Sequence, residues 1–318
     1  MGVIMVMQKS RRLTAMVISC IFFSQFILSV KAENKDCFEY LSLGDSIAKG
    51  YTTNHSDLKA YPDLMQEYLQ NRLDQKVNLT DKTKNGICTA ELNYNILTDK
   101  EVLDILNKAE LITITIGSND LMDEFKDVCQ KILNRTEKFH QLDDAMTMLN
   151  EEVQKHPTLV FAVLTTLNEW DYEEFEEEWK QTMEIINYHK RDATPIIVTN
   201  IYNPTGGLDL PESMNKVVIR VINKMNQIIE QNAKVYHYKI ADLSHLGVEE
   251  YVQQDGLHPD QKGQQLIADA VIATLMEPVK AKSGKEEKHM EAWSVACIGI
   301  TGIILLILGL HKDQEKHE

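Results

Sequence analysis

Residues 111–116, with the sequence LITITI, constrain the fold of this chain more than any other stretch. A continuous apolar run in which nearly every residue is β-branched is typical of a parallel strand covered on both faces. The run ends in Gly-Ser-Asn-Asp, and Leu121, Phe125 and Val128 follow at helical spacing. The stretch therefore predicts a strand, a tight loop and a helix within an α/β domain.

Further apolar runs alternate with helical patterns along the chain. We expect strands at residues 38–43, 76–79, 159–164, 195–201 and 235–240. Helical patterns separate these runs, notably over residues 217–229. Because strands that alternate with helices form doubly wound sheets, the pattern predicts a single α/β domain over residues 33–276.

Two apolar segments at the ends of the chain fall outside this domain. Residues 13–30 follow three basic side chains and precede Lys31 and Ala32, which is the pattern of a secretory signal peptide over residues 1–32. This run of 18 uncharged, mostly apolar residues is long for a signal, so an uncleaved N-terminal anchor is the alternative. Residues 293–310 carry no charge and predict one transmembrane helix.

These segments together predict a tethered protein of the cell membrane. A charged linker, residues 277–292, would join the domain to the transmembrane helix, and residues 311–318 would form a cytoplasmic tail. A leading signal normally fixes translocation, which makes the domain extracytoplasmic on a single-pass protein. The lysines of the linker outnumber those of the tail, and this runs against the positive-inside preference.

The charge balance of the chain is acidic, at −15. Without residues 1–32, the 29 basic and 48 acidic side chains that remain give −19. A surface of this sign repels phosphate backbones, so we expect no nucleic-acid partner. Outside the end segments, Cys37, Cys88 and Cys129 permit at most one internal disulfide, and Cys88 with Cys129 is the first candidate pair because both follow polar loops.

Residues 38–50, FEYLSLGDSIAKG, place Ser46 between a strand and a helix. Gly44 allows a sharp turn, and Ser46 then lies at the carboxyl end of a strand, where open sheets bind ligands. Free N–H groups at a helix N-terminus would favour developing negative charge there. Two interpretations are open, because a serine in this position is either a nucleophile or the N-cap of the helix.

Acyl transfer by serine requires a base, a carboxylate that orients the base, and donors for the oxyanion. Asp255 and His258 stand three residues apart, just before the last predicted helix, so a turn can place both side chains on one side. The pair equally fits a capping aspartate with a surface histidine, or half of a metal site. Gly86 and Asn119 are candidate oxyanion donors, although both types are common in turns.

These segments resemble the four blocks of the SGNH hydrolase superfamily, the GDSL-type lipases and acylhydrolases. The blocks are Gly-Asp-Ser at residues 44–46, the Gly86 loop, Gly-Ser-Asn-Asp at residues 117–120, and Asp255 with His258. The chain looks like a bacterial, membrane-anchored member. The resemblance covers essentially the whole domain and implies a flavodoxin-like, three-layer α/β/α sandwich with a mainly parallel sheet of roughly five strands.

The resemblance also implies a role for each residue. Ser46 would be the nucleophile, His258 the general base and then acid, and Asp255 the residue that orients it. The N–H groups of Ser46 and Gly86 and the side chain of Asn119 would form the oxyanion hole. The family uses neither a metal ion nor an organic cofactor.

The expected function is a membrane-tethered carboxylester hydrolase that acts on a lipid or an acylated envelope polysaccharide through an acyl-serine intermediate. Polysaccharide O-acetylesterase is one specific alternative, and a non-catalytic membrane-anchored binding module on the same scaffold is another. A hydrolase that uses Asp255, His258 and Asp45 around a metal ion is a third. The α/β-hydrolase motif Gly-x-Ser-x-Gly does not fit, because Ala48 stands where its second glycine belongs.

Residues 169–179, EWDYEEFEEEW, mix aromatic and acidic side chains. Phe175, Trp179 and Met183 are four residues apart and would share one helix face. Such a stripe indicates core packing beneath a solvated acidic face, and a mobile lid is the alternative interpretation.

Overall fold

The computed structural model describes residues 37–54, 57–170, 172–203 and 212–277. All of these belong to the first of two units into which the chain divides, residues 1–277 and 278–318. The predicted signal peptide, transmembrane helix and tail lie outside the described residues, as does the predicted linker beyond residue 277. Within the described part of the chain, no helix is both long and apolar enough to cross a bilayer.

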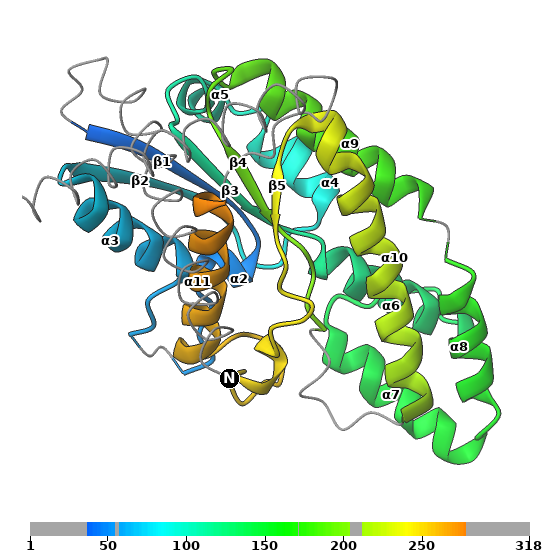
Figure 1. Ribbon diagram of the computed structural model, residues 1–318. Coiled ribbons are helices and arrows are strands. Elements are labelled where there is room, and N and C mark those ends of the chain that lie inside the picture. The colour runs from blue at the N-terminus through cyan, green and yellow to red at the C-terminus, as the bar shows by residue number, and fades with distance from the viewer. Residues whose placement is uncertain (1–36, 55–56, 171, 204–211, 278–318) are drawn as a thin grey trace, which may run out of the picture. The chain divides into compact units, whose positions relative to one another are not determined.

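The described residues contain one sheet of five parallel strands in the order β2-β1-β3-β4-β5 (Figure 1). The strands are β1 (Cys37–Gly44), β2 (Lys76–Thr83), β3 (Leu111–Thr115), β4 (Ile196–Thr199) and β5 (Lys239–Ala241). In the sheet, Gly44 is paired with both Thr83 and Thr115, so three strands end side by side. The loops that follow these strands therefore begin at one edge of the sheet.

Helices cover both faces of the sheet (Figure 1). The helices are α2 (Ser46–Lys49), α3 (Tyr61–Leu73), α4 (Thr89–Glu91), α5 (Lys100–Leu106), α6 (Ser118–Ile132), α7 (Leu142–Lys155), α8 (Leu159–Asn168), α9 (Glu173–His189), α10 (Glu212–Tyr236) and α11 (Gln261–Met276), with a π-helical turn η1 (Leu92–Ile96) and a 3₁₀ turn η2 (Val248–Glu250). Helices α3 and α11 pack together over one face, and α9 and α10 pack together over the other. The expected α/β fold with a mainly parallel sheet is confirmed.

The two faces of the sheet bury separate hydrophobic clusters. Phe38 and Tyr40 of β1 pack with α3 and α11, whereas Leu41 and Leu43 of the same strand pack with the helices opposite. Alternate residues of a strand point to opposite faces, so a strand covered on both sides is apolar throughout. This explains why the run at residues 111–116 is a reliable strand signal.

One expected strand is wrong, because residues 159–164 lie in helix α8. Another, at residues 235–240, is right only for residues 239–240 of β5, since residues 235–236 end helix α10. Val163 and Leu167, four residues apart, are buried as one face of a helix, whereas Phe161 is 71% exposed. A central strand would bury both faces, but a short apolar run does not by itself distinguish a strand from a helix. Helices α7 and α8 pack beside α6 and α10 rather than against the sheet (Figure 1).

Residues 173–179 of the acidic aromatic segment form the start of α9. Phe175, Trp179 and Met183 are buried in the core, and the indole N–H of Trp179 donates to the Tyr238 hydroxyl at 3.0 Å. The interpretation of the stripe as core packing is confirmed.

The three cysteines of the domain are free thiols, so the candidate Cys88–Cys129 disulfide is wrong. Burial raises the pKa of the Cys88 thiol to about 11 and that of Cys129 to about 12. Thiolates are scarce at neutral pH when the pKa lies this high, so neither side chain is poised as a nucleophile.

Candidate active site

The turn that presents Ser46 begins at Gly44, whose φ of +142° is unfavourable for a residue with a side chain. A Cβ at this position would overlap the backbone carbonyl of Thr115 on the neighbouring strand. The N–H of Asp45 then donates to the same carbonyl at 3.0 Å. The turn that carries Ser46 is thus hydrogen-bonded to the end of β3.

Asp45, and not Ser46, is the N-cap of helix α2. Its Oδ1 accepts a hydrogen bond from the N–H of Ile47 at 2.9 Å, and Ser46 is the first residue of the helix. The cap interpretation of Ser46 is therefore wrong, and the hydroxyl is left for another partner.

That partner is His258, which lies 212 residues away in the sequence. Its Nε2 is 2.9 Å from Ser46 Oγ, and its Nδ1 is 2.6 Å from Asp255 Oδ2. Serine and aspartate thus contact opposite nitrogens of one imidazole. This is the geometry in which a histidine accepts a proton from the hydroxyl while the carboxylate fixes its tautomer.

The turn before α11 orients Asp255. Its Oδ1 accepts the N–H groups of Leu257 and His258, each at 3.0 Å, which leaves Oδ2 for the imidazole. Partial burial raises the pKa of Asp255, but these backbone hydrogen bonds and the imidazole outweigh it and hold the pKa below its ordinary value. The hydroxyl of Tyr202 donates to the Leu257 carbonyl at 2.6 Å and fixes the turn from the core side.

The structure also brings Asn119 next to the Gly86 loop. Asn119 Nδ2 donates to the carbonyl of Ile87 at 2.9 Å, and Asp120 accepts the N–H of Thr89 with both carboxylate oxygens at 3.1 Å. These contacts join the start of α6 to the loop after β2. Gly86 is exposed at φ +76°, and a Cβ built there meets no heavy atom within 4 Å.

Two carboxyl groups lie at helix starts in this region, Asp45 as the cap of α2 and Asp120 in the first turn of α6. Desolvation raises the pKa of Asp45 to about 7 and that of Asp120 to about 7. Asp45 Oδ2 has no hydrogen-bond partner among the described residues. Asp45 is fully buried whereas Asp120 is partly exposed, and neither belongs to the hydrogen-bonded series of Ser46, His258 and Asp255.

Sequence reasoning missed two residues that contact this series. The ring of Tyr51 lies 4.5 Å from that of His258, and Gln253 joins the Tyr51 segment to the turn that carries His258. The only signal was proximity, since Tyr51 is five residues after Ser46 and Gln253 two before Asp255.

The arrangement does not resemble a metal centre. Within the described residues, no group of three or more His, Cys, Asp or Glu side chains is placed to hold a metal ion. Asp45, which the metal alternative requires, is fully buried as a helix cap. Both nitrogens of His258 already contact protein groups.

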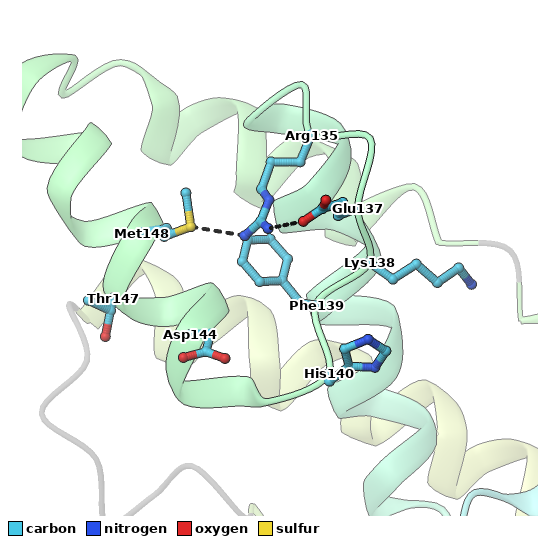
Figure 2. A pocket seen from close by; sticks show the side chains of 8 residues that line it. All are labelled: Arg135, Glu137, Lys138, Phe139, His140, Asp144, Thr147 and Met148. Carbon is cyan, nitrogen blue, oxygen red and sulfur yellow. Dashed lines mark hydrogen bonds and ion pairs between the residues drawn. The ribbon is translucent and has the colours of Figure 1, made fainter.

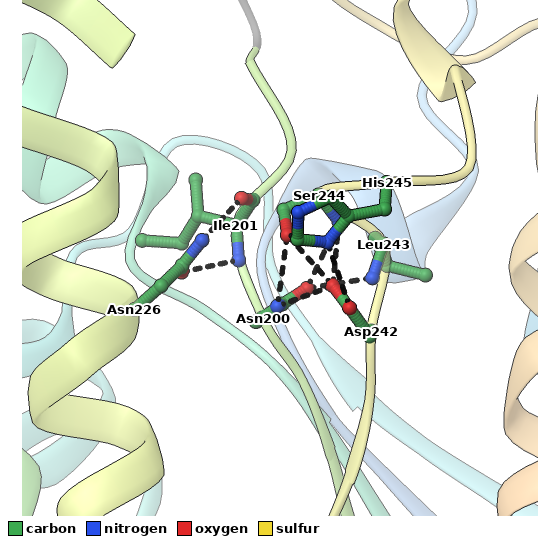
Figure 3. A network of polar contacts seen from close by, with 7 residues as sticks. All are labelled: Asn200, Ile201, Asn226, Asp242, Leu243, Ser244 and His245. Atoms are coloured by element: carbon green, nitrogen blue, oxygen red, sulfur yellow. Dashed lines mark hydrogen bonds and ion pairs between the residues drawn. The ribbon is translucent and has the colours of Figure 1, made fainter. Parts of the chain in front are cut away.

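A cavity of about 600 Å³ lies away from these residues, between the loop after α6 and helix α7. Figure 2 shows its lining, in which the Arg135 guanidinium lies over the Phe139 ring and contacts Met148 and Glu137. None of the five predicted site residues lines it. Another serine, histidine and aspartate meet at the ends of β4 and β5, in the network of Asp242, Ser244 and His245 (Figure 3).

Comparisons with known proteins agree with the fold. The model of the GDSL-like lipase/acylhydrolase family matches residues 40–271. Among solved structures, a lipase from a goat rumen metagenome superimposes with a TM-score of 0.52 at 18% identity over 74% of this chain and 97% of its own. An extracellular lipase from Streptomyces rimosus gives 0.51 at 16% identity over 74% and 99%. No curated protein matches the sequence.

The two structural neighbours show the α/β fold, and the family model covers more than half of the chain. The resemblance inferred from the four sequence blocks is confirmed. The chain belongs to the GDSL-like lipase/acylhydrolase family and is a serine ester hydrolase.

Proposed function

We propose that this protein cleaves carboxylic esters through an acyl intermediate on Ser46. The observation that carries the proposal is the hydrogen-bonded series in which Ser46 Oγ contacts one nitrogen of His258 and Asp255 contacts the other. A serine hydroxyl is a weak nucleophile until an adjacent base takes its proton, and this geometry supplies that base.

The reaction then has two halves. Ser46 Oγ attacks the ester carbonyl carbon while His258 Nε2 takes the hydroxyl proton, and the bond to the leaving alcohol breaks as His258 returns that proton to the alcohol oxygen. Water next attacks the acyl-serine with His258 again as base, which releases the acid and restores Ser46. Asp255 keeps the imidazole in the required tautomer and stabilises its cation.

The oxyanion that forms in each half needs preorganised donors. We assign this role to the N–H of Ser46, the N–H of Gly86 and the carboxamide of Asn119. The bond from Asn119 Nδ2 to Ile87 supports the assignment, because it orients the amide and uses one of its two N–H groups. The N–H of Ser46 belongs to the first residue of α2, where no intrahelical partner exists.

The substrate is proposed to be an ester at the cell envelope. A signal peptide over residues 1–32 and a membrane helix over residues 293–310 would hold the domain on the outer side of the cell membrane. Lipid esters are the first class to test, because both structural neighbours are named as lipases. Acyl groups on envelope polysaccharide are the second class, and release of acetate would identify a polysaccharide O-acetylesterase.

The direct test compares the full-length protein with Ser46→Ala on nitrophenyl esters of increasing acyl length. The unsubstituted protein should hydrolyse them, and the variant should lose about 10³-fold or more of the rate. The matched control is Ser244→Ala, which removes the other serine that contacts a histidine and an aspartate. A chelator should leave the rate unchanged.

Two outcomes contradict the proposal. If Ser46→Ala keeps its activity, Ser46 is not the nucleophile. If the unsubstituted protein hydrolyses no ester but binds acylated lipid or glycan, the domain is a binding module on this scaffold.

A further inference from the structure

The ring of Tyr51 lies against the imidazole of His258. The two ring centroids are 4.5 Å apart, and the ring planes are inclined by 46°. Tyr51 is 37% exposed, whereas the side chain of His258 is 21% exposed. The tyrosine therefore lies at the surface with its ring in contact with the proposed base.

The backbone of Tyr51 is held on both sides. Its N–H donates to the carbonyl of Ser46 at 3.0 Å, and its carbonyl accepts from Gln253 Nε2 at 2.7 Å. One bond leads to the residue of the proposed nucleophile, and the other leads to the turn that carries the proposed base. The position of the Tyr51 backbone is thus fixed relative to both.

Gln253 links these two segments through hydrogen bonds. Its Nε2 also donates to the Pro259 carbonyl at 3.0 Å, and its Oε1 accepts the N–H of Thr53 at 3.0 Å. Its own N–H donates to the carbonyl of His258 at 2.8 Å. One side chain therefore ties the segment after α2 to the turn before α11, about 200 residues later.

We propose that Tyr51 is a positioning residue for His258 and that Gln253 holds it in place. The role rests on the proposed function, in which the imidazole must present Nε2 to Ser46 and Nδ1 to Asp255 at once. Tyr51 limits rotation of the imidazole away from this orientation, because its ring occupies the space beside one ring face. The contact is between rings, so the phenol hydroxyl is not required.

Kinetics of the full-length protein separate a positioning role from a binding role. Tyr51→Ala should lower kcat about threefold to tenfold with KM changed less than about twofold, in line with the energy of an aromatic pair. Tyr51→Phe should restore kcat to within about twofold of the unsubstituted protein. Gln253→Ala should shift kcat in the same direction by a smaller factor.

Tyr188→Ala is the matched control. Tyr188 also contacts a histidine, with its ring 4.9 Å from that of His189, but it is 84% exposed near the end of α9. Removal of this tyrosine–histidine contact should leave kcat and KM unchanged. Because Tyr51 is also partly exposed, Tyr51→Ala opens no buried cavity, and Tyr51→Leu is a second variant should the alanine fail to fold.

A second readout does not depend on ester turnover. Diethyl pyrocarbonate modifies accessible neutral imidazoles, and its rate at His258 is followed by mass spectrometry of the peptide. We expect faster labelling of His258 in Tyr51→Ala, and an unchanged rate in Tyr51→Phe and Tyr188→Ala. If no variant or parent hydrolyses any ester, the proposed function fails, and the labelling rates still decide whether Tyr51 restrains His258.

Three results would overturn the inference. If Tyr51→Ala had a raised KM with unchanged kcat and unchanged labelling of His258, Tyr51 would be a residue that contacts the substrate. A Tyr51→Phe variant as slow as Tyr51→Ala would assign the effect to the hydroxyl. Equal labelling and equal kcat in Tyr51→Ala and the parent would show that the contact has no role.

Discussion

Among the described residues, two clusters of serine, histidine and aspartate differ in how the histidine is shared. In the first, Ser46 and Asp255 contact opposite nitrogens of His258. In the second, Ser244 Oγ and Asp242 Oδ2 both lie within 3.0 Å of the same nitrogen, Nδ1 of His245 (Figure 3). A single nitrogen cannot receive a proton from the serine while it donates one to the aspartate, so only the first cluster can relay a proton.

Exposure separates the two clusters as well. The His245 side chain is 83% exposed, compared with 21% for His258. The second cluster comes from one short segment after β5, whereas the first joins residues from opposite ends of the domain. The same three residue types therefore make a relay only where the fold brings distant segments together.

The second cluster, Asp242, Ser244 and His245, has a structural role. Asp242 Oδ1 accepts from Asn200 Nδ2 and from Ser244 Oγ, each at 2.7 Å, and Asn200 Oδ1 accepts the N–H of Leu243 at 2.6 Å. Figure 3 shows how these side chains join the segments after β4 and β5. The cluster thus stabilises the sheet edge next to the site without a catalytic geometry.

The largest expected difference between the clusters concerns the two histidines. His258→Ala should lower kcat/KM about 10⁴-fold or more, because it removes the only base in contact with Ser46 among the described residues. His245→Ala should change it less than about twofold. Rates of ester hydrolysis by both purified variants check this. A strong loss of kcat/KM in His245→Ala would show that the second cluster also takes part in catalysis.

The aspartates should differ next. Asp255→Asn should lower kcat about 10³-fold, since an amide can hold the imidazole in the wrong tautomer. Asp242→Asn should leave kcat unchanged and reduce the free energy of unfolding by about 1 kcal/mol, the value of a typical hydrogen bond. Steady-state kinetics and urea unfolding of both variants make the measurement. An active Asp255→Asn would mean that another group orients His258.

The two asparagines provide a third contrast. Asn119→Ala should lower kcat about 10²-fold with little change in KM, as expected of an oxyanion donor. Asn200→Ala should instead cost about 1–2 kcal/mol of unfolding free energy at unchanged kcat, because it leaves polar groups of the second cluster without partners. If Asn119→Ala lost stability at unchanged kcat while Asn200→Ala lost kcat, Asn119 would not be an oxyanion donor.

The smallest expected effect is on stability as a function of pH. Desolvation raises the pKa of Asp45 to about 7, so the folded protein holds a proton that the unfolded chain has lost above its ordinary pKa. Stability should therefore fall as the pH rises from about 4 to about 7. The pKa of Asp242 is lowered, since hydrogen bonds from Ser244, Asn200 and His245 outweigh partial burial, and its contribution is lost only in acid.

Urea unfolding at several pH values tests this contrast. Asp45→Asn keeps an acceptor for the N–H of Ile47 but cannot ionise. Its stability should therefore fall less steeply over the same range, by up to about 1.4 kcal/mol for each pH unit. Asp242→Asn should keep the slope of the unsubstituted protein. An identical slope in Asp45→Asn would show that Asp45 has an ordinary pKa.

The sheet could be predicted from the sequence wherever a strand is buried on both faces. Residues 111–116 are mostly apolar and wholly buried because both clusters of the core cover β3, and this burial is visible in the sequence. Residues 159–164 are apolar for another reason, which is that α8 packs on α6 and α10. Composition does not separate these two causes of burial.

The sequence singled out Ser46, Gly86, Asn119, Asp255 and His258 because each follows a predicted strand or precedes the last predicted helix. The sequence did not reveal that Asp45 rather than Ser46 caps α2, since both residue types cap helices well. Nor did it reveal Tyr51 and Gln253, whose contact spans about 200 residues and joins two loops of ordinary composition. The catalytic roles of Ser46, Asp255, His258, Gly86 and Asn119 stay predictions until the variants are measured.

The contact between Gly44 and the Thr115 carbonyl has a consequence for how substrate range can diverge in such a scaffold. Any side chain at Gly44 would separate β1 from β3 where the nucleophile turn and the Asn119 loop both begin, so one substitution would disturb both at once. Around Gly86 there is room for a Cβ, and only its positive φ resists one. A library that aims at new esters should therefore leave residues 44–46 and Tyr51 unchanged and place its diversity at the neighbours of Gly86 in their loop.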